Sequence, residues 1–214
     1  MSMIFAEEQL VAGGWTLIVI GLCSVISAAI ILERILALRR KRVIAPDVVR
    51  ALDACHEEDG MDALKDCCHQ HHGAFARIVT AVLTMRNYDH DSAVERMRAV
   101  GRVEVERLER GLTVLEIIAA ATPLLGLLGT VLGMMDVFGV ITAEGIGDPQ
   151  VLAGGISKAL ITTVAGLSVA IPTLAFHSLF TRRVNGLAAE MQDRATALLV
   201  HDRQQPDHRP DAAP

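Results

Sequence analysis

The chain has 214 residues, of which 51% are hydrophobic, and its 20 Lys and Arg residues against 25 Asp and Glu residues give a formal net charge of -5. This composition is too apolar for one soluble domain, although it leaves enough polar residues for segments in water. The acidic balance gives no support to a nucleic-acid-binding protein. We therefore predict an all-α membrane protein that carries additional helices in water.

Three apolar runs each approach the ~20 residues with which a helix crosses ~30 Å of hydrocarbon. With the polar stretches between them, they divide the chain into an N-terminal segment at 1–13, a first transmembrane helix at 14–38, a polar insert at 39–111, a second transmembrane helix at 112–141, a loop at 142–157, a third transmembrane helix at 158–181, a helix in water at 182–200 and a disordered tail at 201–214.

The distribution of basic residues predicts the orientation of these segments. Lys and Arg are absent from residues 1–33, whereas residues 34–116 hold fourteen and the segment after Phe180 holds five. Because such residues gather on the cytoplasmic side, we expect the insert and the C-terminus in the cytoplasm, and the N-terminus and the loop outside it. Glu7 and Glu8 stand where a signal peptide would be positive, which favours a first helix that is not cleaved.

The insert has helical patterns at residues 46–55 and 74–85. A capping box at Ser92 and Glu95 predicts a further helix, which we expect to continue unbroken into the second transmembrane helix because the next proline is Pro123. A seam of apolar and small residues follows this helix at steps of three or four: Val94, Met97, Gly101, Val105, Leu108, Leu112 and Leu115. The seam fits packing on the chain's own helices and packing between subunits equally well.

Three of the four cysteines lie in the insert, where a reducing cytoplasm makes free thiols the expected state. On a helix, Cys67 with His71 and Cys68 with His72 would have the i, i+4 spacing of metal ligands. Because the spacing fits no established zinc pattern, we favour a solvated, histidine-rich surface and predict no metal or other cofactor.

Both later transmembrane helices carry a stripe of small residues and threonines. The stripe of the second helix is Thr122, Gly126, Gly129 and Gly133, and that of the third is Ala159, Thr163, Gly166, Ala170 and Thr173. Such faces let helices approach closely in lipid, so they predict tight packing and, from that packing, a homo-oligomer.

Three further observations bear on ion transport. Thr130, Thr162 and Thr163 lie at similar depths, where each hydroxyl either bonds to its own helix or faces a polar cavity. No Asp, Glu, Lys or Arg occurs between residues 117 and 135 or between 159 and 180. A proton or sodium ion that crosses a membrane normally needs a carboxylate there, so a partner helix must supply it if this chain conducts.

Residues 121–135 and 154–172 resemble the corresponding blocks of the MotA/TolQ/ExbB proton channel family, closest to its ExbB type. The resemblance implies a pentameric bundle in the bacterial inner membrane, with a periplasmic N-terminus and loop. It further implies that the pentamer surrounds the helices of an ExbD-like one-span dimer, whose aspartate carries H+, and acts on a TonB-like protein.

The resemblance also assigns roles to single residues. Thr130 and Thr163 would line the channel, and Pro123 and Pro172 would belong to the helix framework of the family. From the residues alone, we place Thr162 beside these threonines and assign helix packing to Gly126, Gly129, Gly133, Gly166 and Ala170. One residue departs from the pattern, because Lys158 stands at the channel mouth where many ExbB and TolQ proteins have glutamate. A cation there disfavours incoming protons, so we expect Lys158 to pair with Asp136, Glu144 or Asp148, or to reach the headgroups.

The predicted function is therefore a subunit driven by the proton-motive force that energises TonB-dependent transport across the outer membrane. The alternatives are a TolQ-like role in envelope maintenance, a flagellar-type stator subunit that uses sodium, and a membrane scaffold that does not conduct. An enzyme is not expected, since no nucleophile and base are paired at a plausible site.

Overall fold

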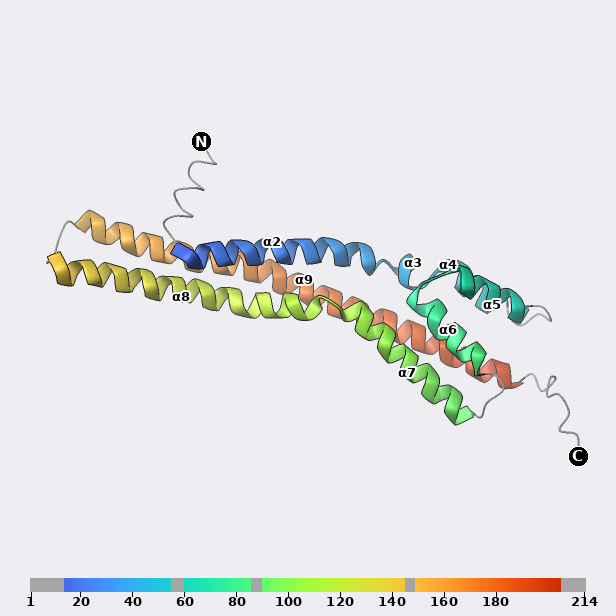
Figure 1. Ribbon diagram of the computed structural model, residues 1–214. Helices are drawn as coiled ribbons and strands as arrows, with labels where there is room; N and C mark the ends of the chain where they lie inside the picture. Colours follow the sequence, from blue (N-terminus) through green and yellow to red (C-terminus); the bar gives the residue numbers. More distant parts are fainter. Residues whose placement is uncertain (1–13, 55–59, 86–89, 145–148, 205–214) are drawn as a thin grey trace, which may run out of the picture. The chain divides into compact units, whose positions relative to one another are not determined.

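The computed structural model describes residues 14–54, 60–85, 90–144 and 149–204, and every element in these ranges is an α-helix (Figure 1). The helices are α2 (Gly14–Ala37), α3 (Arg40–Val43), α4 (Pro46–Asp53), α5 (Gly60–Gln70), α6 (Ala74–Thr84), α7 (His90–Glu109), α8 (Leu112–Glu144) and α9 (Pro149–Gln204). They form two compact units. The apolar unit comprises Met1–Glu33 and Gly111–Leu179, and the polar unit comprises Arg34–Arg110 and Phe180–Pro214, so α2 and α9 contribute to both.

The apolar unit contains the membrane-length helices. Within the described residues, α2, α8 and α9 are long and apolar enough to cross a membrane. Helices α8 and α9 run antiparallel, because Gly166 lies against Thr122 while Ala159 lies against Gly133 (Figure 1). The prediction of an all-α membrane protein with three transmembrane helices is confirmed.

The polar unit has a core of its own, built from the amphipathic helices of the insert and the last part of α9. Pro46 begins α4, and Gly73 is the N-cap residue of α6, as the predicted helices at 46–55 and 74–85 require. The core contains the following buried side chains: Val48, Leu52, Leu64, Phe75, Ile78, Val79, Met97, Leu187, Met191 and Leu198. Their spacing of three and four residues along α6 and α9 buries one face of each helix.

Two predicted boundaries are wrong. Helices α7 and α8 do not form one continuous helix, because Gly111 has a φ of +85° and ends the helical path after Glu109. The predicted loop at 142–157 is largely helical, since α8 extends to Glu144 and α9 already begins at Pro149. Proline suits the first turn of a helix, and the glycines that follow cost only about 1 kcal/mol each in a helix interior.

The last helix also differs slightly from its predicted end at residue 200, because α9 continues to Gln204. The predicted N-terminal segment (1–13), Cys55, Asp148 and residues 205–214 of the predicted tail lie outside the described residues.

Candidate functional site

Glycines hold α8 and α9 in close contact at the middle of the apolar unit. A Cβ atom on Gly166 would lie 2.7 Å from the carbonyl oxygen of Thr122, and one on Gly126 would lie 2.9 Å from that of Thr162 and 3.0 Å from the Cα of Thr163. Both would collide with backbone, which cannot move aside without shifting a helix. Glycine therefore permits the distance at which the two helices pack.

The contact continues towards the end of α8. A Cβ atom on Gly133 would lie 2.9 Å from the Cβ of Ala159, and one on Gly155 would lie 2.3 Å from the Cγ2 of Val137. The small-residue stripes of the two helices therefore pack on each other within one chain. Close packing of these stripes does not by itself require a second copy, so the homo-oligomer stays a prediction from the family resemblance.

The threonines of α9 form hydrogen bonds across this contact. The hydroxyl of Thr162 donates to the carbonyl oxygen of Gly126 at 3.1 Å and to that of Ala159 at 2.6 Å, and Thr163 donates to Gly126 at 3.2 Å. Thr162 is buried between the helices, whereas Thr163 is half-buried. The structure thus brings two of the three predicted threonines to one carbonyl group of α8.

Thr130 is placed differently from the other two. It is half-buried, and its hydroxyl donates to the carbonyl oxygen of Leu127 in its own helix at 2.7 Å. Of the three threonines predicted to line the channel, Thr130 and Thr163 are therefore more exposed than Thr162. A channel-lining role for all three stays a prediction.

Three other threonines are fully buried in the apolar unit: Thr16, Thr122 and Thr173. Thr16 comes from α2, and its Oγ1 would lie 2.9 Å from a Cβ on Gly129, so all three membrane-length helices meet there. Thr16 is not among the residues predicted from the sequence. The signal that could have identified it is the helical spacing of Thr16 and Ser27, two polar residues that lie on one face of an otherwise apolar helix. In the structure both are buried, as is Ile20 on the same face.

Two of these threonines adjoin prolines inside the long helices. Thr122 precedes Pro123 in α8 and donates to the carbonyl oxygen of Ile118, and Thr173 follows Pro172 in α9 and donates to a carbonyl oxygen of its own helix at 2.7 Å. The carbonyls that lose a backbone donor to these prolines are those of Ala119 and Ser168, four residues before each proline. The two hydroxyls donate instead to the carbonyl oxygens of Ile118 and Val169, so each is satisfied within its own helix.

Charged residues lie at the ends of the predicted spans rather than beside the threonines. Asp136 and Lys158 are both exposed, and Lys158 directly precedes Ala159, which packs on Gly133. The apolar unit therefore offers hydroxyls and backbone carbonyls at the depth of the threonines, and the sequence there offers no carboxylate to accept a proton.

The cysteine and histidine residues of the insert do not form the predicted i, i+4 pairs. Helix α5 ends at Gln70, so His71 and His72 lie beyond it. Cys68 is buried in the core, whereas the Nε2 atom of His71 lies 3.5 Å from a carboxylate oxygen of Asp47. Within the described residues, no three His, Cys, Asp or Glu side chains are grouped as metal ligands.

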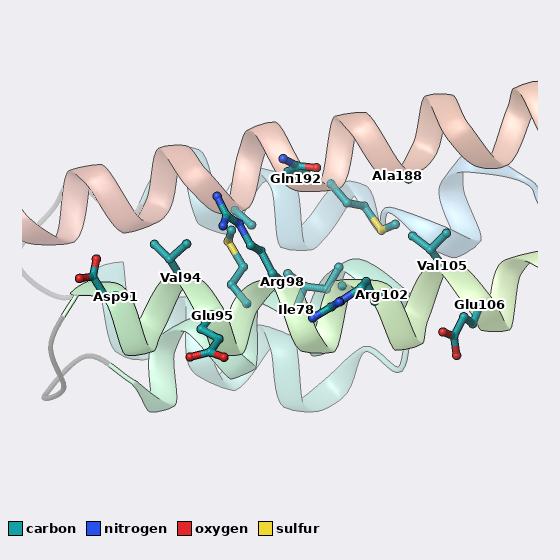
Figure 2. A pocket seen from close by; sticks show the side chains of 14 residues that line it. Ile78, Asp91, Val94, Glu95, Arg98, Arg102, Val105, Glu106, Ala188 and Gln192 are labelled. Atoms are coloured by element: carbon teal, nitrogen blue, oxygen red, sulfur yellow. The ribbon is translucent and has the colours of Figure 1, made fainter.

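The seam of α7 has two environments. Met97 is buried in the polar core and also lines, together with Val94, Gly101 and Val105, a groove of about 880 Å³ between α7 and the last part of α9 (Figure 2). On the α9 side the groove is lined by Ala188 and Gln192. Charged residues of α7 also line it: Asp91, Glu95, Arg98, Arg102 and Glu106. The seam therefore packs in part on the chain's own helices, and a role between subunits stays untested.

A buried carboxylate joins α6 to α7. The Glu104 side chain is only 3% exposed and forms ion pairs with Arg77 of α6 and, at 2.8 Å, with Arg107 of its own helix. The hydrogen bond that Arg77 donates to Glu104 raises the pKa of the Arg77 guanidinium. Arg77 also donates to the carbonyl oxygen of His72. Two guanidinium groups thus compensate the buried charge.

Comparison with known proteins relates this arrangement to a family. A profile of the MotA/TolQ/ExbB proton channel family matches residues 70–193. The chain is 32% identical over 194 residues to an ExbB-like biopolymer transport protein of Synechocystis, a match that covers 89% of this chain and 75% of that protein. It is 27% identical over 190 residues to the biopolymer transport protein exbB1 of Vibrio cholerae, with 87% and 82% covered.

A third relative is longer than this chain. The chain is 33% identical over 156 residues to an ExbB homolog of Methanothermobacter thermautotrophicus, and the match covers 72% of the chain but only 55% of that protein. The chain thus spans just over half the length of this relative. The family profile nevertheless covers more than half of the chain, and it agrees with three membrane-length helices. The chain belongs to the MotA/TolQ/ExbB proton channel family.

Proposed function

We propose that this chain is the channel-forming subunit of an ExbB-type energiser, which uses the proton-motive force to drive TonB-dependent transport across the outer membrane. In this proposal, several copies, five by family resemblance, surround the membrane helices of an ExbD-like one-span partner in the bacterial inner membrane. The N-terminus faces the periplasm and the C-terminus the cytoplasm. The names of the relatives support the energiser role, and the positions of Lys and Arg support the orientation.

The observation that carries the proposal is the chemistry of the α8 and α9 contact. Its polar groups are threonine hydroxyls and backbone carbonyls, and the sequence has no carboxylate at the same depth. Hydroxyls can position water or a neighbouring carboxyl group, but they do not ionise near neutral pH and so do not take up and release a proton as a carboxyl group does. An aspartate of the partner therefore carries the proton, and Thr130 and Thr163 position it.

The first test is isolation of the complex. The full chain is co-expressed with an ExbD-like one-span protein whose N-terminal membrane helix bears an aspartate, and only this partner is affinity-tagged. We expect both proteins to purify together in mild detergent and to form one particle by electron cryo-microscopy. A partner that purifies alone would contradict the proposal.

The second test concerns the threonines. Valine keeps the shape of threonine and removes the hydroxyl, so Thr130→Val and Thr163→Val should leave assembly intact and lower proton flux, with the double variant lower than either single variant. Thr173→Val is the control for Thr163→Val, because Thr173 lies in the same helix but donates to Val169 of that helix, whereas Thr163 donates to Gly126 of α8. Wild-type flux from the double variant would exclude these hydroxyls from the proton path, and a full complex without any flux would favour the scaffold.

A further inference from the structure

Four consecutive basic residues follow the first membrane-length helix. Arg39, Arg40, Lys41 and Arg42, here called the basic turn, begin two residues after the end of α2, and all four are exposed. Helix α2 has 24 residues, a length of about 36 Å, which exceeds the ~30 Å of bilayer hydrocarbon. When α2 spans the membrane, its last turn and the basic turn therefore reach the phosphate headgroups.

The basic turn is held in place rather than free to move as a tail. Its backbone closes on itself through hydrogen bonds from Arg42 N to Arg39 O at 2.9 Å and from Ile44 N to Arg40 O at 2.8 Å. The side chains on either side are buried, with exposures of 4% for Leu38 and 2% for Ile44. The turn is thus anchored by apolar groups while its cations face outward.

Two further contacts fix the turn within the polar unit. A Cβ atom on Gly73 would lie 3.0 Å from the carbonyl oxygen of Val43 and 3.1 Å from that of Arg42, so α6 begins directly against this backbone. Arg40 forms an ion pair with Glu190 of α9. Arg40 is therefore engaged within the protein, and Arg39, Lys41 and Arg42 are the cations that the fold presents outward.

We propose that the basic turn binds the phosphate headgroups of anionic phospholipids in the leaflet where α2 ends. The occupant is a lipid rather than free phosphate, because the turn directly continues a membrane-length helix and because a fixed cluster of cations complements an anionic membrane surface. The site does not depend on the proposed proton transport. Each cation near such a surface strengthens binding by about fivefold.

The test uses the full chain purified in a neutral detergent, with native mass spectrometry to measure retention of phosphatidylglycerol and phosphatidylcholine. We expect the wild type to prefer phosphatidylglycerol, and the variant Arg39→Gln, Lys41→Gln, Arg42→Gln to lose this preference by about tenfold or more. The matched control removes three exposed cations of α7, as Arg96→Gln, Arg98→Gln, Arg102→Gln, and should keep the preference. Circular dichroism checks that both variants keep wild-type helix content.

Three results would overturn the proposal: equal retention of both lipids by the wild type, an unchanged preference in the basic-turn variant, and an equal loss in the control variant. If the triple basic-turn variant does not fold, the single variants Arg39→Gln, Lys41→Gln and Arg42→Gln replace it, and each should lower the preference by about fivefold. In a final experiment, lipid retention by the wild type is measured again after addition of inorganic phosphate or of sodium chloride, at equal ionic strength. Both should weaken lipid retention equally through screening, and specific displacement by phosphate would identify a phosphate site instead.

Discussion

At the scale of single residues, Gly166 limits how closely α9 can approach α8. The position for its missing Cβ lies 2.7 Å from a backbone carbonyl oxygen and 3.2 Å from the Cα of Gly126. Because backbone atoms flank it, no side-chain rotation relieves a substituent there. A larger residue at this position would push the two helix backbones apart. The hydrogen bonds from Thr162 and Thr163 to the carbonyl oxygen of Gly126 would then lengthen.

The variant Gly166→Ala should therefore destabilise the protein, although alanine favours helices over glycine by about 1 kcal/mol. Overpacking of this kind costs about 1–3 kcal/mol, and each kcal/mol lowers the midpoint of thermal unfolding by about 2–4 °C for a chain of this size. Gly186→Ala in the same helix is the control, since no atom lies within 4 Å of its Cβ position. A midpoint in detergent that does not fall for Gly166→Ala would show that the helices tolerate a wider spacing.

Cys68 provides a prediction about pH. Burial raises the pKa of its thiol to about 11, and burial also raises the pKa of the less enclosed Cys67. At pH 8, alkylation of the folded protein by iodoacetamide, mapped by peptide mass spectrometry, should modify Cys68 more slowly than Cys67, because the thiolate is the reactive form. Equal rates at both cysteines would contradict the burial of Cys68.

The same pKa shift predicts how stability changes in alkali. The pKa of Cys68 is higher in the folded protein than the ~8.5 of an unfolded chain, so its contribution to stability is present below about pH 8.5 and is lost as pH rises towards 11. The unfolding temperature of the wild type should therefore fall between about pH 8.5 and 11, and a Cys68→Ala variant should show a smaller fall over the same range.

At the scale of the helices, Gly111 separates two elements that the sequence predicts as one. A glycine inside a helical pattern is compatible with a continuous helix, so periodicity alone could not reveal the break. Its φ of +85° disfavours any side chain. Gly111→Ala should therefore destabilise the protein by about 1–2 kcal/mol, measured by thermal unfolding. An increase in stability would instead mean that α7 and α8 can form one helix.

The ion pairs of Glu104 with Arg77 and Arg107 predict that removing the arginines lowers stability more than removing the glutamate. Arg77 and Arg107 are about half exposed, at 41% and 55%, and can be hydrated when Glu104 is removed, whereas Glu104 is buried. The double variant Arg77→Ala, Arg107→Ala leaves a buried charge without a partner and should cost about 3–5 kcal/mol. Glu104→Ala should cost less, and the opposite order of unfolding temperatures would contradict a charged Glu104.

The helix contacts also show which features the sequence could predict. Periodicity located α4 and α6, because one face of each is apolar, and apolar runs of membrane length located α2, α8 and α9. The start of α9 at Pro149 was missed. Pro149 suits a first helical turn, but Gly154 and Gly155 weaken the helical pattern; in the structure Gly155 packs against Val137 of α8, a tertiary contact that a local pattern does not show.

At the scale of the whole molecule, the candidate site was only partly accessible to sequence reasoning. The stripes and threonines could be named from their spacing, but the sharing of the Gly126 carbonyl by Thr162 and Thr163 depends on how α8 and α9 pack. Whether Cys67 and Cys68 share a helical face with His71 and His72 could not be predicted, because it depends on where α5 ends, which is at Gln70. Thr16 shares a face of α2 with Ser27, but only the packing of α2 against Gly129 brings Thr16 to the site.

The central claim is that this chain conducts protons only together with a carboxylate from a partner. Proton flux into vesicles under an imposed membrane potential tests it directly, with the chain alone, with its one-span partner, and with the partner's intramembrane aspartate replaced by asparagine. We predict flux from the two-protein complex, and background flux from the chain alone and from the asparagine variant. Flux from the chain alone, or undiminished flux with the asparagine partner, would contradict the account.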